Sequence, residues 1–444
     1  MTDNNIIELT PFRAKLTRSL ARRGERLLAS ANLAEEVANL EPLEAYYIVK
    51  EIGLNQALPI LLELNHEQLQ AGIDLDCWNR YDFVTESLDE WLTSFAQAGA
   101  ETLARSFLSL DYVVQLLFLT QNITVYDPDM DQVPELDDEE NDTSRAMTPD
   151  GFYLLELKVG TALKIHPFAL LDALYGYDSE STHRLLSEVR VDLPTQIEEE
   201  ALRFRNGRMQ DLGFATPDEA AILFSRPPMR PPPRSLELLD SSVTRLPSVY
   251  AGPLIETTLL QQAMSIITDQ KCLARLEQEI VWAINSAITA YGEKTQDIKQ
   301  ITNIAERVRD TISLGLESLI AQQEPGNPPD GAAAAAKAVE LLDIWGINDL
   351  FRHGYAATLD LQKEAQQALH EPRIQAWYNL ADTEQSDEPA DRQERAFLAA
   401  LLGRHPMRGG FDLAGAEKIK AFSCLTEIDV AKVRLQRLVA NLTQ

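Results

Sequence analysis

A chain of 444 residues is too long for one ordinary hydrophobic core, so about two to four domains are expected. The formal net charge of −29 argues against nucleic-acid binding, which needs a positive surface, and favours basic partners. Three widely spaced cysteines form no CxxC pair, which argues against a zinc knuckle and fits a reducing compartment. With no signal-peptide pattern and no apolar run near the roughly 20 residues that span a bilayer, we expect a cytoplasmic protein without a membrane span.

Residues 1–30 are predicted to form a basic N-terminal helix. This stretch holds six basic and three acidic residues, against the strongly acidic remainder of the chain. Arg18, Arg22 and Arg26 follow one helical stripe and are candidate partner-binding residues. The helix could instead dock on the acidic body of this protein, or contact a membrane surface or nucleic acid.

Residues 31–225 are predicted to form a helical-repeat domain. A shift of 46 positions places Gly53 on Gly99 and Asn65 on Asp111, and each copy reads as a helix, a glycine stop and another helix. A period of this length is typical of helix-pair solenoids of the HEAT or armadillo type. Such repeats serve mainly as interaction surfaces, which points to a binding role.

Two short segments inside this domain predict one small β-hairpin. Residues 122–127 and 151–159 carry β-branched and aromatic side chains in partial alternation. Between them, residues 127–145 contain nine acidic side chains and are predicted to form an acidic loop.

The acidic loop has a partial resemblance to a calcium-binding loop. Asp127, Asp129 and Asp131 have EF-hand spacing, but the sixth position is Gln132 where a glycine makes the sharp turn. The twelfth position is Asp138 rather than the bidentate glutamate. We therefore predict no metal site and no cofactor.

Residues 226–236 are predicted to be a proline-rich linker, because proline fixes φ and removes the amide donor. Beyond it, residues 237–444 predict a C-terminal helical domain with longer helices, broken at 324–331 and 382–393. The predicted fold class is therefore all-α and multi-domain, with helix-pair repeats in the N-terminal half and one small hairpin.

The segment RFRNGRMQDLGFATPDEAAIL, residues 203–223, combines three arginines with a helix start. The letters TPDE at 216–219 predict an N-cap, a proline in the first turn and a capping box. Arg205 and Arg208 are candidate anion-binding residues if they converge near the amino end of that helix, and Arg352 near another helix start is a third candidate. The alternative is a helix junction in which these arginines form only ion pairs.

Common catalytic motifs are missing from the sequence, which contains no HExxH, P-loop, GxGxxG or GxSxG pattern. We assign no catalytic residue and favour a binding protein over an enzyme. The expected function is a protein–protein interaction scaffold or regulatory adaptor. The alternative is a sensor of a small anion or nucleotide, or an enzyme, with an arginine-lined cleft.

Three segments together resemble an uncharacterised bacterial family known only as a domain of unknown function. They are EAYYIVKEIGLNQALPILLELNHEQLQAGIDLDCW, EEEALRFRNGRMQDLGFATPDEA and LFRHGYAATLDLQKEA. The first also weakly resembles the helical N-terminal domain of MgtE-type magnesium transporters and of FliG. That resemblance implies a right-handed stack of short helices used for interaction, although this chain lacks the transporter's membrane region.

Overall fold

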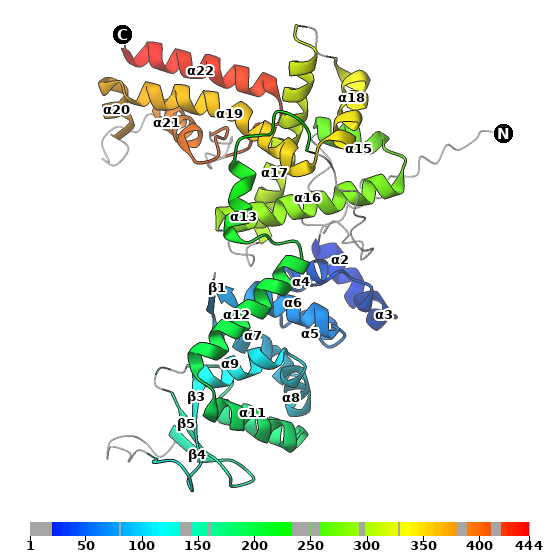
Figure 1. Ribbon diagram of the computed structural model, residues 1–444, viewed down its shortest axis with the longest axis vertical. Helices are drawn as coiled ribbons and strands as arrows, with labels where there is room; N and C mark the ends of the chain where they lie inside the picture. The colour runs from blue at the N-terminus through cyan, green and yellow to red at the C-terminus, as the bar shows by residue number, and fades with distance from the viewer. Residues whose placement is uncertain are drawn as a thin grey trace, which may run out of the picture. The chain divides into compact units, whose positions relative to one another are not determined.

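The computed structural model describes residues 20–79, 81–133, 144–158, 160, 162–232, 250, 258–292, 298–326, 329–379, 389–409 and 419–443. It divides into an N-terminal unit, Ser19–Phe214, and a C-terminal unit that takes in Ala215–Glu293 and Lys299–Gln444. Helices dominate both units, which confirms the all-α prediction (Figure 1). The division after Phe214 falls before the predicted proline-rich linker. Residues 1–19 with Arg18, most of the acidic loop and residues 233–236 lie outside the described residues.

The N-terminal unit is a stack of short helices with a longer helix packed across it (Figure 1). Its helices are α2 (Leu20–Leu28), α3 (Leu33–Ala38), α4 (Pro42–Ile52), α5 (Leu58–Leu61), α6 (His66–Asp76), α7 (Thr85–Ala96), α8 (Ala100–Leu108), α9 (Tyr112–Asn122), α10 (Pro167–Tyr177), α11 (Ser179–Val191) and α12 (Pro194–Asp211). The long helix α12 packs against α9 and α6. This contact positions the arginines discussed below.

The repeat seen in the sequence is also present in the structure. A shift of 46 residues carries α6 onto α9 over its full length. The N-cap residues Asn65 and Asp111 correspond, and both accept a backbone N–H from the helix they begin. Gly53 and Gly99 also correspond, with φ of 89° and 111°, a left-handed conformation that favours glycine.

The unit has more β-structure than the single predicted hairpin. The predicted pair corresponds to β3 (Ile123–Tyr126) and β5 (Leu154–Leu157), which run antiparallel. A third strand, β4 (Arg145–Met147), pairs with the other edge of β5. The short strands β1 (Trp78–Asn79) and β2 (Asp82–Phe83) form a separate hairpin. Two-residue strands carry too little alternation to be recognised in a sequence.

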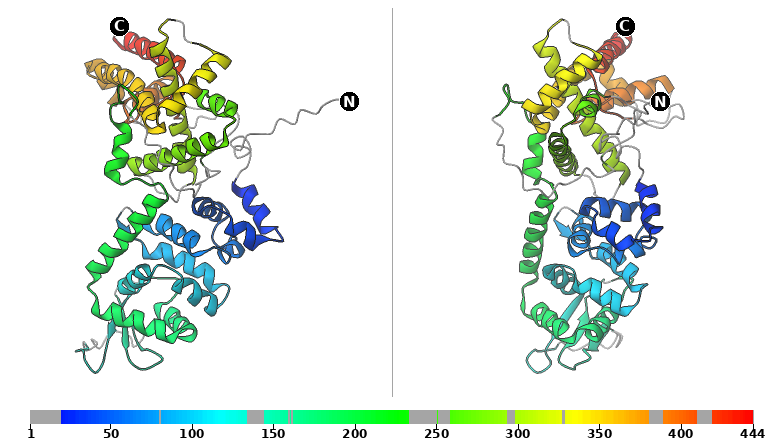
Figure 2. Two further views of the ribbon diagram at one scale, coloured as in Figure 1. Left: turned by 45° about the vertical axis from the view of Figure 1, so that its right-hand side comes forward. Right: turned by 90° about the vertical axis from the view of Figure 1, so that its right-hand side faces the viewer.

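The C-terminal unit is built from longer helices, as predicted, and Figure 2 shows them from two further sides. They are α13 (Pro217–Ala221), the 3-10 turn η2 (Ile222–Phe224), α15 (Leu259–Ile266), α16 (Gln270–Tyr291), α17 (Ile298–Gln323), α18 (Gly331–Ile344), α19 (Ile347–Leu369), α20 (Pro372–Asn379), α21 (Pro389–Leu402) and α22 (Leu425–Thr443). Helices α19 to α22 share one apolar core with α17, which includes Leu361, Phe397 and Leu435.

A buried aromatic cluster fixes η2 on this unit. The Phe224 ring lies 5.2 Å from the ring of Tyr355 and 5.7 Å from that of Phe351, both in edge-to-face geometry. His405 completes the cluster and is 4% exposed. One of its ring nitrogens bonds the Tyr291 hydroxyl, and the other lies 3.3 Å from the Thr311 hydroxyl.

Acidification is expected to destabilise this unit through His405. Burial, with a smaller contribution from Arg307, lowers the pKa of His405 to about 3 from its ordinary 6.5. The imidazole of His405 therefore binds a proton in the unfolded chain that it does not bind in the folded chain. The free energy of unfolding should fall by about 1.4 kcal/mol for each pH unit below about 6.5.

Urea unfolding at pH 7.5 and 5.5 measures this effect. The variant His405→Phe should lose this part of the pH dependence, whereas His370→Phe, at an exposed position, should keep it. An identical pH dependence in wild type and His405→Phe would show that the buried imidazole is not responsible.

Candidate functional site

Helix α12 carries Arg205 and Arg208, and both contact groups of the N-terminal unit itself. Arg208 binds the Asp74 carboxylate with two nitrogens, at 2.6 and 3.0 Å, and also pairs with Asp111. Arg205 Nε donates to the Asp74 carbonyl oxygen at 3.0 Å, and its guanidinium lies 5.2 Å from the ring centroid of Trp78. Two-point binding of a carboxylate is the geometry for which arginine is best suited.

This arrangement joins the two repeat copies. Asp74 lies on α6 and Asp111 is the N-cap of the corresponding helix α9, so one guanidinium connects both. The Asp74 side chain is completely buried, and burial raises its pKa although Arg208 acts in the opposite direction. Burial also lowers the pKa of Arg205 to about 10. The contacts of Arg208 occupy all three of its guanidinium nitrogens, the atoms that an external anion would need.

The third candidate, Arg352, is in the C-terminal unit on α19. It pairs with Asp349 at 3.0 Å and donates to the carbonyl oxygen of Arg226. It therefore holds the start of the proline-rich segment against its own helix. Binding of an anion by the three arginines remains a prediction.

The predicted helix start at 216–219 is present in detail. Thr216 is the N-cap of α13, and its hydroxyl accepts the N–H of Glu219. The Glu219 carboxylate accepts the N–H of Thr216 at 3.0 Å, which completes the capping box. Pro217 occupies the first turn, as predicted.

The basic stripe is described only in part. Arg22 and Arg26 lie on α2 with exposed side chains, whereas Arg23 beside them pairs with Glu44 at 2.5 Å. Arg18 lies outside the described residues. Partner binding by this stripe remains a prediction.

The start of the acidic loop is organised by an arginine. Arg190, near the end of α11, binds both carboxylate oxygens of Asp131 at 2.7 and 3.0 Å and lies 4.0 Å from Asp127. This contact lowers the pKa of Asp131 to about 2. Within the described residues, no group of three acidic, histidine or cysteine side chains could hold a metal ion.

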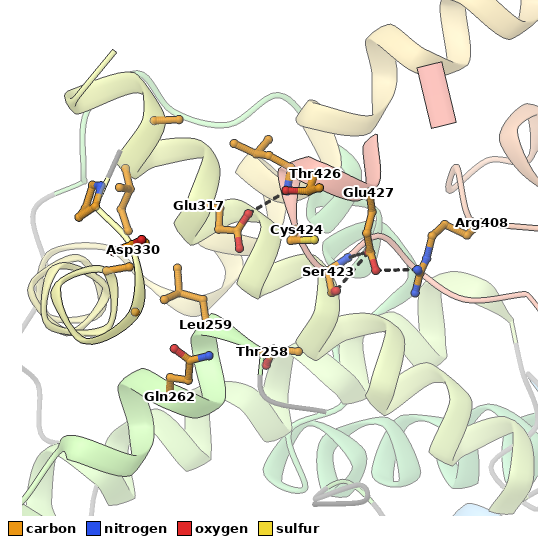
Figure 3. A pocket seen from close by; sticks show the side chains of 16 residues that line it. Thr258, Leu259, Gln262, Glu317, Asp330, Arg408, Ser423, Cys424, Thr426 and Glu427 are labelled. Atoms are coloured by element: carbon orange, nitrogen blue, oxygen red, sulfur yellow. Dashed lines mark hydrogen bonds and ion pairs between the residues drawn. The ribbon is translucent and has the colours of Figure 1, made fainter. Parts of the chain in front are cut away.

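One cleft of the C-terminal unit has a volume of about 740 Å³ (Figure 3). Helices α15, α18 and α22 all begin at its wall, and α17 supplies Glu317. Helix starts carry partial positive charge. At two of the three starts the N–H groups already have acceptors, because Glu317 accepts the N–H of Leu425 and Thr258 caps α15 in a capping box with Gln261.

The chemistry of this cleft does not resemble a nucleophilic active site. Burial raises the pKa of the Cys424 thiol and that of the Glu317 carboxyl. A thiol with a raised pKa is a poor nucleophile, because the thiolate is the reactive form. Glu427 is engaged by the Ser423 N–H at 2.8 Å and by Arg408 at 2.6 Å (Figure 3).

Exposed apolar side chains occur at and around the junction of α11 and α12. Val191 and Leu193 at this junction are 69% and 58% exposed. The Arg190–Asp131 ion pair places Met130, 77% exposed, beside the end of α11. Tyr112 lies at the start of α9, where its hydroxyl bonds Glu188 of α11. We call Tyr112, Met130, Val191 and Leu193 the corner patch.

Sequence reasoning missed the corner patch. Its members come from three separate stretches of the chain, and only the letters VDLP at 191–194 carried a local signal. Two apolar residues flanking an aspartate, just before a proline, indicate a turn in which neither apolar side chain has an obvious core position.

Within the described residues, no single helix has the length and apolar character needed to cross a membrane; only α8 and α9 taken together, bent by 115°, meet that test.

The chain matches the model of one protein family over residues 8–443, and it therefore belongs to that family, which is described as "Family of unknown function (DUF6178)". This agrees with the resemblance seen in the three sequence segments. No curated protein and no solved structure matches the chain. The resemblance to MgtE transporters and FliG is thus not supported by these comparisons.

Proposed function

We propose that this member of a family of unknown function is a cytoplasmic protein–protein interaction scaffold or regulatory adaptor. The observation that supports the proposal is the corner patch. Large apolar side chains that lie together on a surface are a mark of interaction sites, whereas single ones are ordinary. Three of the four patch residues are more than half exposed, so they contribute little to the core of the N-terminal unit.

The charge around the patch suggests the chemistry of the partner. Asp127, Asp131, Glu188 and Asp192 border it, and Arg190 is already paired with Asp131. The acid-rich sequence 134–143 falls between β3 and β4 in the chain. We propose a partner segment that combines apolar side chains with lysine or arginine, because such a segment matches both the patch and its acidic border.

The test places a photo-crosslinking amino acid at position 191 in cells that make this protein. Discrete crosslinked products are expected from position 191. Position 430 is the matched control, because Val430 is also a helical valine and is 64% exposed. The same partner should be lost on affinity capture with Val191→Asp and retained with Val430→Asp. Its crosslinked peptide should carry basic residues.

Two results would overturn the proposal. Equal crosslinking from positions 191 and 430 would show that the corner patch has no particular partner. Loss of the captured partner in the double variant Arg22→Ala and Arg26→Ala, with Val191→Asp still binding, would assign the interaction to the basic stripe of α2 instead.

A further inference from the structure

A second cleft, in the N-terminal unit, has two lysines on its wall and a volume of about 440 Å³. It lies where α4 ends, between the loop at 53–56 and one face of α7. Lys50 comes from α4 and Lys164 from the segment that precedes α10. A volume of this size is within the range of small-molecule sites.

Lys50 is fixed in place by a buried carboxylate. Its Nζ lies 2.9 and 3.0 Å from the two oxygens of Asp76, whose side chain is 3% exposed. Trp91 Nε1 donates to the same carboxylate at 2.7 Å, which fixes its orientation. The ammonium group is therefore held at the cleft wall and cannot swing into solvent without breaking its ion pair with the buried Asp76 carboxylate.

Lys164 is positioned through its backbone. The N–H groups of Lys164 and Ile165 donate to the buried carboxylate of Asp89, at 2.6 and 3.0 Å. Its side chain meets Glu90 at 3.3 Å in a pair whose members are both more than half exposed. Exposed pairs of this kind contribute little, so Lys164 can exchange Glu90 for another anion.

Neutral hydrogen-bonding groups complete the wall. Asn55 Oδ1 accepts from Ser94 at 3.2 Å and from Gln97 at 2.9 Å, which leaves its amide nitrogen as a donor. The Thr93 hydroxyl is buried and has no hydrogen-bond partner among the described residues.

We propose that this cleft binds a small anion that carries carboxylate or phosphate oxygens. Lys164 supplies a positive charge held only by an exposed, exchangeable pair with Glu90, Lys50 stays paired with Asp76 at the wall, and the Asn55 amide supplies a directional hydrogen bond. The anion site expected from the arginines of the sequence is thus assigned to lysines on other elements. The inference goes beyond the proposed adaptor function and does not depend on it.

The test uses isothermal titration of the full chain with inorganic phosphate in one arm and succinate in the other. Saturable binding is expected in at least one arm, and the arm that binds identifies the anionic group. Lys164→Met should weaken it by about tenfold or more. Lys363→Met is the matched control, because Lys363 forms a similarly exposed pair with Asp360 at 3.1 Å, and it should bind as wild type does.

Two results would overturn the proposal. Absence of saturable binding in both arms by the wild-type chain would remove the site. Equal weakening by Lys164→Met and Lys363→Met would show that anions only screen surface charge. Because Lys164 is largely exposed, its replacement leaves the fold intact, and an unchanged melting temperature without ligand verifies this.

Discussion

Alanine at Gly354 is expected to prevent the C-terminal unit from folding. A Cβ atom on Gly354 of α19 would lie 1.8 Å from the carbonyl oxygen of Thr311 on α17. Gly315 of α17 lies where the same two helices, α17 and α19, cross. A Cβ atom on Gly315 would lie 1.9 Å from the carbonyl oxygen of Leu350. The obstructing atoms are backbone atoms, which cannot turn away as a side chain can. We expect a loss of more than about 3 kcal/mol, at or beyond the usual cost of overpacking.

The measurement compares Gly354→Ala with Gly207→Ala in chemical unfolding and limited proteolysis. Gly207 is an exposed position inside helix α12, and an added Cβ there meets no atom within 4 Å. Alanine at that position should increase stability by about 0.5–1 kcal/mol, through helix propensity alone. Gly354→Ala should instead expose sites in α17 and α19 to protease. Resistance equal to that of wild type would show that the two helices can separate without loss of the unit.

The role of Gly354 in helix packing could not be predicted from the sequence. Gly354 lies in the segment RHGY at 352–355, in which the sequence made Arg352 a candidate anion-binding residue. A helical pattern around a glycine predicts the helix, but it does not reveal that a second helix crosses there. The partner helix is encoded by a different part of the chain, and Gly315, which faces Gly354 there, is another glycine that has no local signature.

Local features were predictable because their causes are local. The capping box at Thr216 depends on four consecutive residues, and the repeat that relates α6 to α9 depends on apolar spacing and a glycine stop. The pairing of Arg208 with Asp74 depends on residues 134 positions apart. The lysine-lined cleft and the corner patch were equally hard to predict from the sequence, because each combines segments that only tertiary packing brings together.

Replacing Arg208 by methionine is expected to destabilise the N-terminal unit by about 3–5 kcal/mol. The change leaves the fully buried carboxylate of Asp74 without its two-point partner and removes the connection to Asp111. Adding Asp74→Asn to Arg208→Met should recover a large part of the loss, because the buried group is then neutral. Arg203→Met is the control, since Arg203 is largely exposed in its pair with Glu200 and should cost less than about 0.5 kcal/mol.

The pH dependence of the Arg208→Met variant gives a further test. Burial already raises the pKa of Asp74 in the wild-type chain, and loss of Arg208 removes the main influence that lowers it. A carboxyl with a raised folded-state pKa stabilises the fold at low pH, and this stabilisation is lost as the pH rises through that pKa. The deficit of Arg208→Met should therefore be larger at pH 7.5 than at pH 5, whereas Arg208→Met with Asp74→Asn should show no such increase.

This result also decides between the two interpretations of the arginines on α12. A large, pH-dependent loss would mean that the Arg208 guanidinium is required by Asp74, so an external anion could bind it only by competing with a buried carboxylate. A variant as stable as Arg203→Met would mean that Asp74 does not depend on Arg208. The guanidinium would then be available to a ligand. The anion site predicted from the arginines of the sequence would then be a second candidate, in addition to the lysine-lined cleft.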